Sequence, residues 1–231
     1  MQIFLLWYYI CGDNMVKILF EDEHIVICEK DIGMLSEEGN SDESLPEILK
    51  KQLGSDIYTL HRLDKPVGGA IMYAKTKKSA AAFSQLINSN ALRKTYFAIT
   101  DGALENKSGQ LCDLLFKDSR KNKTFVVKRE RKGIKKAILN YDILSENEKH
   151  AFVKIILETG RSHQIRVQFA SRKTPLTGDG KYGSRDNKCT IALWSHNLSF
   201  THPFTKETVS TESFPDMTAY PWNEFRTESK T

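Results

Sequence analysis

The segment HRLDKPVGG, residues 61–69, places a single carboxylate among cations. Asp64 follows Arg62 by two positions and directly precedes Lys65. Pro66 fixes its own backbone φ and restrains the preceding residue to extended geometry, and the glycines that follow permit a tight turn. An acid on such a stiff turn has the support that a nucleophile or a general base needs. Taken alone, the segment fits better a surface acid paired with its basic neighbours, because exposed ion pairs are common.

The segment RKTYFAIT, residues 93–100, alternates as a strand does. In a strand, Lys94, Tyr96 and Ala98 share one face. Tyr96 could stack on a nucleic-acid base or take part in proton transfer. The simpler interpretation is a tyrosine packed on one face of a sheet, where aromatic residues are common.

The segment LETGRSHQIRVQF, residues 157–169, predicts a strand that ends before a helix. Ser162 is the expected N-cap, and Ile165 and Phe169, four positions apart, are expected to face the core. Arg166 next to an acid would favour its ionised form and, with a bidentate guanidinium, orient it better than a lysine could. The alternative is an amphipathic helix whose cations are exposed to solvent.

Several common catalytic and binding motifs are absent from the sequence. It has no phosphate-binding GxxxxGK[ST] or GxGxxG, no metal-binding HExxH and no GxSxG nucleophile elbow. The four cysteines are widely spaced and form no CxxC, so neither a disulfide framework nor a zinc site is expected. The cysteine usage indicates a reducing, cytoplasmic compartment.

The positive charge is concentrated in one stretch. The formal net charge is +5, and residues 117–136 read KDSRKNKTFVVKRERKGIKK, with only Asp118 and Glu130 opposing the cations. Such a run is either a solvated, charged hairpin or a surface that contacts phosphates.

The elements that must position these residues are mostly strands. Hydrophobic periodicity predicts helices over 45–53, 77–90 and 162–173, and strands over 24–30, 70–76, 91–102, 122–130, 134–144, 150–159, 189–200 and 207–213. Ser44 or Asp42 is the expected cap of the first helix. Because the strands follow one another instead of alternating with helices, we expect an α+β fold with a mixed, largely antiparallel sheet flanked by helices. One catalytic domain over residues 15–231 is expected.

Residues 1–14, MQIFLLWYYICGDN, are expected to form a peripheral N-terminal extension. Their apolar run of about ten residues is too short to span a bilayer, and no basic region precedes it, as a secretory signal would require. We therefore expect no association with a membrane.

The three segments occur in this order and are followed by GDGKYG, residues 178–183, and SHNLSFTHPFT, residues 195–205. Together they resemble the RluA-type family of RNA pseudouridine synthases, whose pattern is HRLDxxxxG, KxY, LxTGRxHQIR and GDxxYG. The resemblance covers roughly residues 16–205. It departs from the family at EKDIGML, residues 29–35, which lacks the proline of the KPxG motif. The few residues before the catalytic domain leave no room for an S4 RNA-binding domain.

The resemblance implies the pseudouridine synthase fold and the isomerisation of specific uridines in structured rRNA or tRNA. Asp64 would be the nucleophile, attacking C1′ of the sugar or otherwise breaking the glycosidic bond, after which the uracil rotates and rejoins through C5. Tyr96 would stack on the uracil and help to remove the C5 proton, and Arg166 would pair with Asp64. The reaction needs no cofactor and no metal. The target base must flip out of the folded RNA.

The same resemblance implies a set of residues near the RNA. Arg62 would enter the space that the flipped base leaves, and His61 is expected to be a structural hydrogen bonder within this set. Asp179 is expected to organise its loop. The expected partner is RNA, with no obligatory protein partner and a monomeric state. The remaining residues expected to contact substrate or RNA are Lys65, Arg161, His163 and Gln164.

Two other functions compete with this interpretation. The first is a noncatalytic RNA-binding module or RNA chaperone on the same fold, but binding alone would not need Asp64, since a carboxylate repels phosphate. The second is a glycoside hydrolase that uses two carboxylates. It requires a second acid on an equally constrained segment, and none is evident in the sequence.

Overall fold

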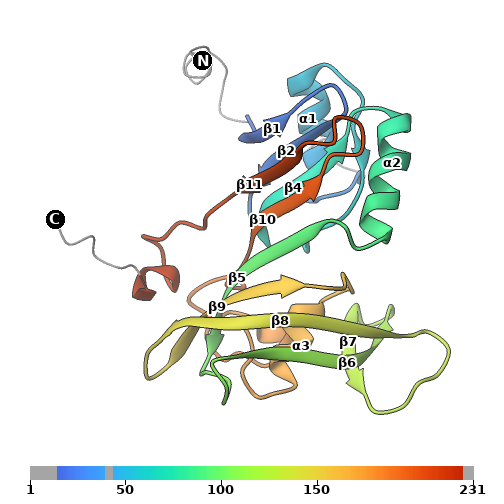
Figure 1. The fold of residues 1–231 in the computed structure, drawn as a ribbon. Helices are drawn as coiled ribbons and strands as arrows, with labels where there is room; N and C mark the ends of the chain where they lie inside the picture. Colours follow the sequence, from blue (N-terminus) through green and yellow to red (C-terminus); the bar gives the residue numbers. More distant parts are fainter. Residues whose placement is uncertain (1–14, 40–43, 226–231) are drawn as a thin grey trace.

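The computed structural model describes residues 15–39 and 44–225. These residues form one sheet of eleven strands with helices packed beside it (Figure 1). The main path of the sheet runs β1-β2-β4-β10-β5-β9-β8-β6-β7, with β11 paired to β10 and β3 to β4. The strands are β1 (Ile18–Glu21), β2 (Ile25–Lys30), β3 (Tyr58–Thr59), β4 (Gly68–Ala74), β5 (Arg93–Asp101), β6 (Ser108–Asp118), β7 (Lys123–Val127), β8 (Ile134–Glu146), β9 (His150–Leu157), β10 (Leu193–Thr201) and β11 (Thr208–Glu212). The helices are α1 (Leu45–Leu53), α2 (Lys77–Asn88) and α3 (Gln164–Ala170), with 3₁₀ turns η1 (Gly180–Tyr182) and η2 (Trp222–Phe225).

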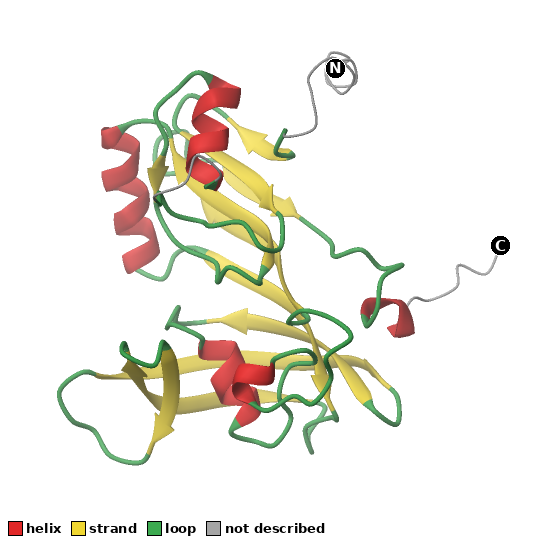
Figure 2. Ribbon diagram, turned by 180° about the vertical axis from the view of Figure 1, so that it is seen from behind, coloured by secondary structure: helices red, strands yellow, loops and turns green. Residues whose placement is uncertain are grey.

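The sheet is mixed and largely antiparallel, as predicted. Within the described residues, the pairing of β10 with β4 is parallel, whereas the other strand pairs are antiparallel. The α+β fold class with flanking helices is therefore confirmed. In Figure 2, α1 and α2 lie beside one half of the sheet and α3 beside the other half.

The two faces of the sheet are covered by different elements because neighbouring strand residues point to opposite sides. Leu45 and Leu49 of α1 pack with Val26 and Ile71 on one face, while Phe83 of α2 packs with other strand residues on the opposite face. Ile165 and Phe169 of α3 join the α1 cluster, as predicted. α1 and α3 thus share the face of the sheet that carries Tyr96.

The start of α3 differs from the prediction. Ser162 is not the N-cap; the helix begins after His163, whose backbone φ of 52° is left-handed and whose side chain makes no capping bond. The helix is also not amphipathic, because every side chain from Gln164 to Phe169 is buried between the sheet and the surrounding loops. The alternative of an amphipathic helix with exposed cations is therefore excluded, because Arg166 is buried.

The charged stretch forms a longer antiparallel arrangement than predicted. β6 pairs with both β7 and β8, and its eleven residues were not recognised as a strand in the sequence. Ser44 does precede α1, and its hydroxyl bonds the Glu47 side chain without capping a backbone N–H. The predicted extension over residues 1–14 and the alternative cap Asp42 lie outside the described residues.

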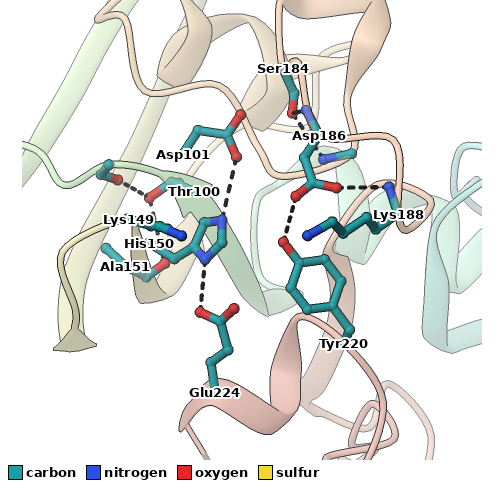
Figure 3. A network of polar contacts seen from close by, with 12 residues as sticks. Thr100, Asp101, Lys149, His150, Ala151, Ser184, Asp186, Lys188, Tyr220 and Glu224 are labelled. Carbon is teal, nitrogen blue, oxygen red and sulfur yellow. Dashed lines mark hydrogen bonds and ion pairs between the residues drawn. The ribbon is translucent and has the colours of Figure 1, made fainter.

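The last described segment, which ends in η2, packs on the face of the sheet opposite Tyr96. Polar contacts hold it there, and we call this group the C-terminal clasp, made of Asp101, His150, Asp186, Tyr220 and Glu224 (Figure 3). Beside the clasp, Trp222 packs in an apolar cluster with strand residues of that face. None of the described helices is long and apolar enough to cross a membrane.

Candidate active site

A pocket that is open to solvent brings the three key segments of the sequence together. It lies between the loop after β3, the middle of β5, the end of β9 and the start of α3. All three predicted catalytic residues line it. Of the predicted RNA-contacting residues, four line the pocket, namely Arg62, Arg161, His163 and Gln164.

The turn that carries Asp64 is shaped by its own backbone and by two glycines. The N–H of Val67 donates to the Asp64 carbonyl at 2.9 Å, which closes the turn. Gly69 has a φ of 109°, and a Cβ there would come within 2.3 Å of the Ser195 carbonyl oxygen. Only glycine therefore lets β4 leave the turn so close to β10.

The segment after β2 holds the Asp64 turn from behind. The hydroxyl of Ser36 donates to the Leu63 carbonyl at 2.9 Å and accepts the Leu63 N–H at 3.2 Å. The buried ammonium of Lys30 donates to the carbonyls of Asp31 and Lys65. Burial lowers the pKa of Lys30 to about 8, although the negative charges of Asp31 and Asp64 oppose this shift. Backbone contacts on both sides of Asp64 thus fix its position.

Arg166 bridges two carboxylates beneath the pocket. Its Nη1 donates to Asp64 Oδ2 at 2.9 Å, and its Nε and Nη2 donate to the two oxygens of Asp179 at 2.7 and 2.9 Å. The side chains of Arg166 and Asp179 are 6% and 1% exposed, whereas that of Asp64 is 30% exposed. Burial alone would lower the pKa of Arg166, but its bonds to Asp179 and Asp64 raise it. The guanidinium is therefore a permanent charge held in one orientation.

This arrangement leaves one oxygen of Asp64 available. Within the described residues, Arg166 is the hydrogen-bond partner of the carboxylate, at Oδ2, and Oδ1 has none. Asp179, by contrast, has both oxygens occupied and is buried. Asp179 cannot serve as a second acid at the surface of the pocket, so a two-carboxylate glycoside hydrolase finds no support in this geometry.

His163 stands on the other side of Asp64. Its Nε2 is 3.7 Å from Asp64 Oδ2, and its Nδ1 is 2.8 Å from the hydroxyl of Tyr182. Burial lowers the pKa of His163, supported by the charges of Arg166 and Lys181 and opposed by Asp64 and Asp179. The imidazole is therefore neutral near pH 7.

Tyr96 forms part of the pocket wall on β5. It lies between Ile155 of β9 and Ser195 of β10 in the sheet and is 7% exposed. Burial raises the pKa of Tyr96 to about 12; contact with the Ser195 hydroxyl opposes this rise, and the charge of Asp64 adds to it. The phenol keeps its proton at neutral pH.

The other predicted residues fall into two groups. His61 and Gln164 are used inside the protein: His61 Nε2 accepts the Met72 N–H at 3.1 Å, and the Gln164 amide bonds Thr159, Arg161 and Ile138. Arg62, Lys65 and Arg161 are exposed. Arg62 Nη1 pairs with Glu37 at 3.0 Å, and Arg161 Nε donates to the Lys136 carbonyl at 3.1 Å.

The sequence analysis did not identify three contributions to the site. These are the buried Lys30, Tyr182, and the pairing of Asp179 with Arg166. For the last two, the GDGKYG motif was a usable signal. For Lys30, the signal was the KPxG motif, whose lysine is retained in EKDIGML although the proline is not. No group of three or more metal-binding side chains occurs in the described part of the chain.

Comparison with known proteins defines the class of enzyme. The family of RNA pseudouridylate synthases matches residues 24–171. The uncharacterised RNA pseudouridine synthase YhcT of Bacillus subtilis is 33% identical over 87% of this chain and 69% of its own length. The dual-specificity RNA pseudouridine synthase RluA of Vibrio parahaemolyticus is 30% identical over 83% of this chain and 80% of its own length. The chain therefore belongs to the RNA pseudouridylate synthase family, of the RluA type, and is an isomerase.

Solved structures share its fold. Human RNA pseudouridylate synthase domain containing 1 superposes with a TM-score of 0.74 at 20% identity, covering 90% of this chain and 86% of that one. Human RNA pseudouridylate synthase domain containing 4 gives a TM-score of 0.72 at 22% identity, with 87% and 89% covered. The sheet and its helices therefore form the pseudouridine synthase fold.

Proposed function

We propose that this pseudouridine synthase isomerises specific uridines in structured rRNA or tRNA, with Asp64 as the nucleophile. The carboxylate would attack C1′ of the target uridine, and the electrons of the N1–C1′ bond would leave with the uracil. The uracil then rotates, C5 bonds to C1′ and the carboxylate is released. The C5 proton is lost, and N1 gains one. The observation that carries this proposal is the unbonded Oδ1 of Asp64 at the pocket wall, with Oδ2 held by Arg166.

Arg166 and Tyr96 support this chemistry in different ways. Because Asp179 clamps Arg166 from below, the guanidinium keeps Asp64 aimed without competing for its second oxygen. Tyr96 is a buried phenol in the pocket wall, suited to stacking on the uracil. As a neutral phenol, it would assist proton transfer at C5 by hydrogen bonding.

The target base must leave the RNA stack to reach a pocket of this kind, at a cost of a few kcal/mol. Arg62 lies at the pocket and is exposed, paired only with the equally exposed Glu37. Such a pair exchanges partners at little cost, so Arg62 is free to fill the space left by the base. Lys65, Arg161 and cations of residues 117–136 would contact phosphates.

His61 and Gln164 support the RNA-binding surface from within. The His61 imidazole and the Gln164 amide form hydrogen bonds with the protein backbone and with a neighbouring side chain. They would hold the Asp64 turn and the loop before α3 in place. His163 belongs to the pocket itself, close to Asp64.

The names of the relatives include a tRNA enzyme and a dual-specificity RNA enzyme. A tRNA pseudouridine synthase C of Haemophilus influenzae is 27% identical over 85% of this chain and 91% of its own length, and the Vibrio relative is named as dual-specific. We propose a monomeric, cytoplasmic enzyme that needs no cofactor, metal or protein partner. Pseudouridine mapping of total RNA from cells with and without this protein would identify the positions.

The proposed reaction is tested by tritium release. RNA labelled with tritium at uridine C5 loses the label to water when C5 becomes the site of glycosidic attachment. We expect the purified protein to release tritium from cellular rRNA or tRNA without added metal or cofactor. Binding without release from any cellular RNA would instead support a noncatalytic RNA-binding role.

A further inference from the structure

Tyr182 connects the catalytic pocket to the β7 strand through its ring and its hydroxyl. The hydroxyl accepts the N–H of Thr124 at 2.8 Å and lies 2.8 Å from Nδ1 of His163. Arg166 Cζ and Lys123 Nζ each lie 5.1 Å from the centre of the ring. Tyr182 therefore contacts the start of α3 on one side, and Lys123 and Thr124 of β7 on the other.

The hydroxyl of Tyr182 has two partners at hydrogen-bond distance, the Thr124 N–H and His163 Nδ1. Burial raises the pKa of Tyr182, so the phenol keeps its proton at neutral pH. At Thr124 the phenol oxygen is an acceptor, because the partner is a backbone N–H. The Thr124 hydroxyl beside it donates to the Ser162 carbonyl at 3.0 Å, and His163 Nδ1 lies 2.8 Å from the phenol oxygen. A phenol that donates to Nδ1 requires that nitrogen to be unprotonated.

We propose that Tyr182 is a positioning residue that fixes His163 as the neutral tautomer with its proton on Nε2. This N–H then faces Asp64 Oδ2, 3.7 Å away. His163 presents a hydrogen-bond donor to the pocket, so Nε2 cannot accept a proton from the substrate. If the proposed function holds, this donor suits the carboxylate or a carbonyl oxygen of the flipped uracil.

The backbone of His163 has an unusual conformation at the point where the ring lies next to Asp64. Its φ of 52° is left-handed, a conformation that residues with a side chain seldom adopt.

The charged groups around the ring are Asp64, Arg166, Asp179 and Lys181. Their two negative and two positive charges oppose one another, and burial favours the neutral imidazole. The Tyr182 bond then selects between its two tautomers.

The tautomer can be read without any RNA. Long-range ¹H–¹⁵N correlation spectra of the ¹⁵N-labelled full chain report the protonation of each ring nitrogen, and His163→Gln identifies the His163 signals. At pH 7 we expect an unprotonated Nδ1 and a protonated Nε2. A protonated Nδ1 in the wild-type protein would overturn the proposal, whether or not the enzyme acts on RNA.

Tyr182→Phe removes the hydroxyl and keeps the ring. We expect the His163 signals to shift toward a mixture of tautomers and the imidazole to protonate at higher pH. In tritium release we expect kcat to fall about fivefold, as the loss of one hydrogen bond brings, with KM changed less than about twofold. Unchanged His163 signals, or an unchanged kcat, would contradict the positioning role.

Tyr141→Phe is the matched control. The Tyr141 hydroxyl donates to the Asn106 carbonyl at 3.2 Å, and this residue is not part of the pocket lining. Its loss should leave the His163 signals, kcat and KM as in the wild type. Equal effects of the two substitutions on the His163 signals would mean that general loosening, and not the Tyr182 bond, sets the tautomer.

Discussion

The pocket and the C-terminal clasp are built from the same kinds of side chain, but in the pocket a buried arginine holds a carboxylate at the wall of an open cavity. Each contains carboxylates, a histidine and a tyrosine. In the clasp, Glu224 Oε2 bonds His150 and the Tyr220 hydroxyl bonds Asp186 (Figure 3). The side-chain amide of Asn147 also donates to Glu224 Oε2. Asp101 Oδ1 is buried without a hydrogen bond, whereas the partners of Glu224 in the described residues all bind Oε2 of a side chain that is 29% exposed.

In the pocket, Asp64 has one oxygen held and the other free, on a side chain that is 30% exposed. The types of residue in a polar cluster therefore do not identify a catalytic site. What distinguishes the pocket is the buried Arg166, which holds one oxygen of Asp64 and leaves the other at the wall of an open cavity. Substitutions in the pocket should reduce activity, and those in the clasp should reduce stability.

A substitution of Arg166 should reduce both activity and stability, and its effect on stability is the largest that we expect. Arg166→Met leaves the buried Asp179 without its partner, which should lower the free energy of unfolding by about 3–5 kcal/mol and abolish tritium release. Denaturant unfolding measures the first effect. Arg62→Met, at an exposed ion pair, should cost less than about 1 kcal/mol.

A second substitution separates the two effects of Arg166. In Arg166→Met with Asp179→Leu, apolar side chains replace the buried pair, and much of the lost stability should return. Activity should not return, because Asp64 has lost its partner. A double variant that recovered activity would show that Arg166 is needed for folding alone.

In the clasp, we expect the opposite pattern. His150→Gln should lower the free energy of unfolding by roughly 1–3 kcal/mol, because a hydrogen bond to a charged carboxylate is lost. Since the clasp lies on the face of the sheet opposite Tyr96, kcat should stay within about twofold of the wild type. A large loss of kcat at unchanged stability would mean that the clasp acts on the site.

The clasp should also weaken in acid. Burial alone would raise the pKa of Glu224, but its bonds with His150 and Asn147 hold it below the usual value, and the Tyr220 bond lowers the pKa of Asp186. A carboxyl with a lowered pKa in the folded state stabilises the protein above its unfolded pKa, near 4. This stability is lost as the pH falls through the folded value.

Unfolding curves between about pH 6 and pH 2 test this expectation. The variant with Glu224→Gln and Asp186→Asn should lose less stability over that range than the wild type. Parallel curves for the two proteins would contradict a role for these carboxyls in acid unfolding.

The smallest expected effect concerns RNA affinity. Arg161→Gln, at the pocket surface, should raise KM and reduce the slope of log K against log salt by about one, as the loss of one phosphate contact does. Lys149→Gln, beside the clasp, is the control and should leave the slope unchanged. Equal changes would indicate that net charge, and not the pocket surface, sets RNA affinity.

The sequence predicted the fold class and the meeting of the key segments, but not the supporting contacts. Consecutive strands indicated the mixed sheet. The motifs taken together predicted that Asp64 pairs with Arg166, which lies 102 positions further along the chain. β6 escaped notice because its outer residues, including Leu114 and Phe116, are as apolar as its inner Leu115. An alternating pattern was therefore absent.

The missed contacts depend on tertiary structure. The left-handed backbone of His163 and the buried ammonium of Lys30 are set by partners distant in the chain. Local preference predicted Ser162 as the cap, because serine favours that position. Packing of α3 on all sides, together with the Tyr182 bond, placed His163 there instead.

Asp64→Asn tests the central claim most directly. The amide keeps the size of the side chain but cannot act as the nucleophile, so tritium release should fall by at least ~10⁴-fold. The free energy of unfolding should change by less than about 1 kcal/mol, since the side chain is partly exposed. Asp186→Asn, the matched change in the clasp, should retain activity. Substantial tritium release by the Asp64→Asn protein, without reversion of the amide to the acid, would contradict the assignment of Asp64 as the nucleophile.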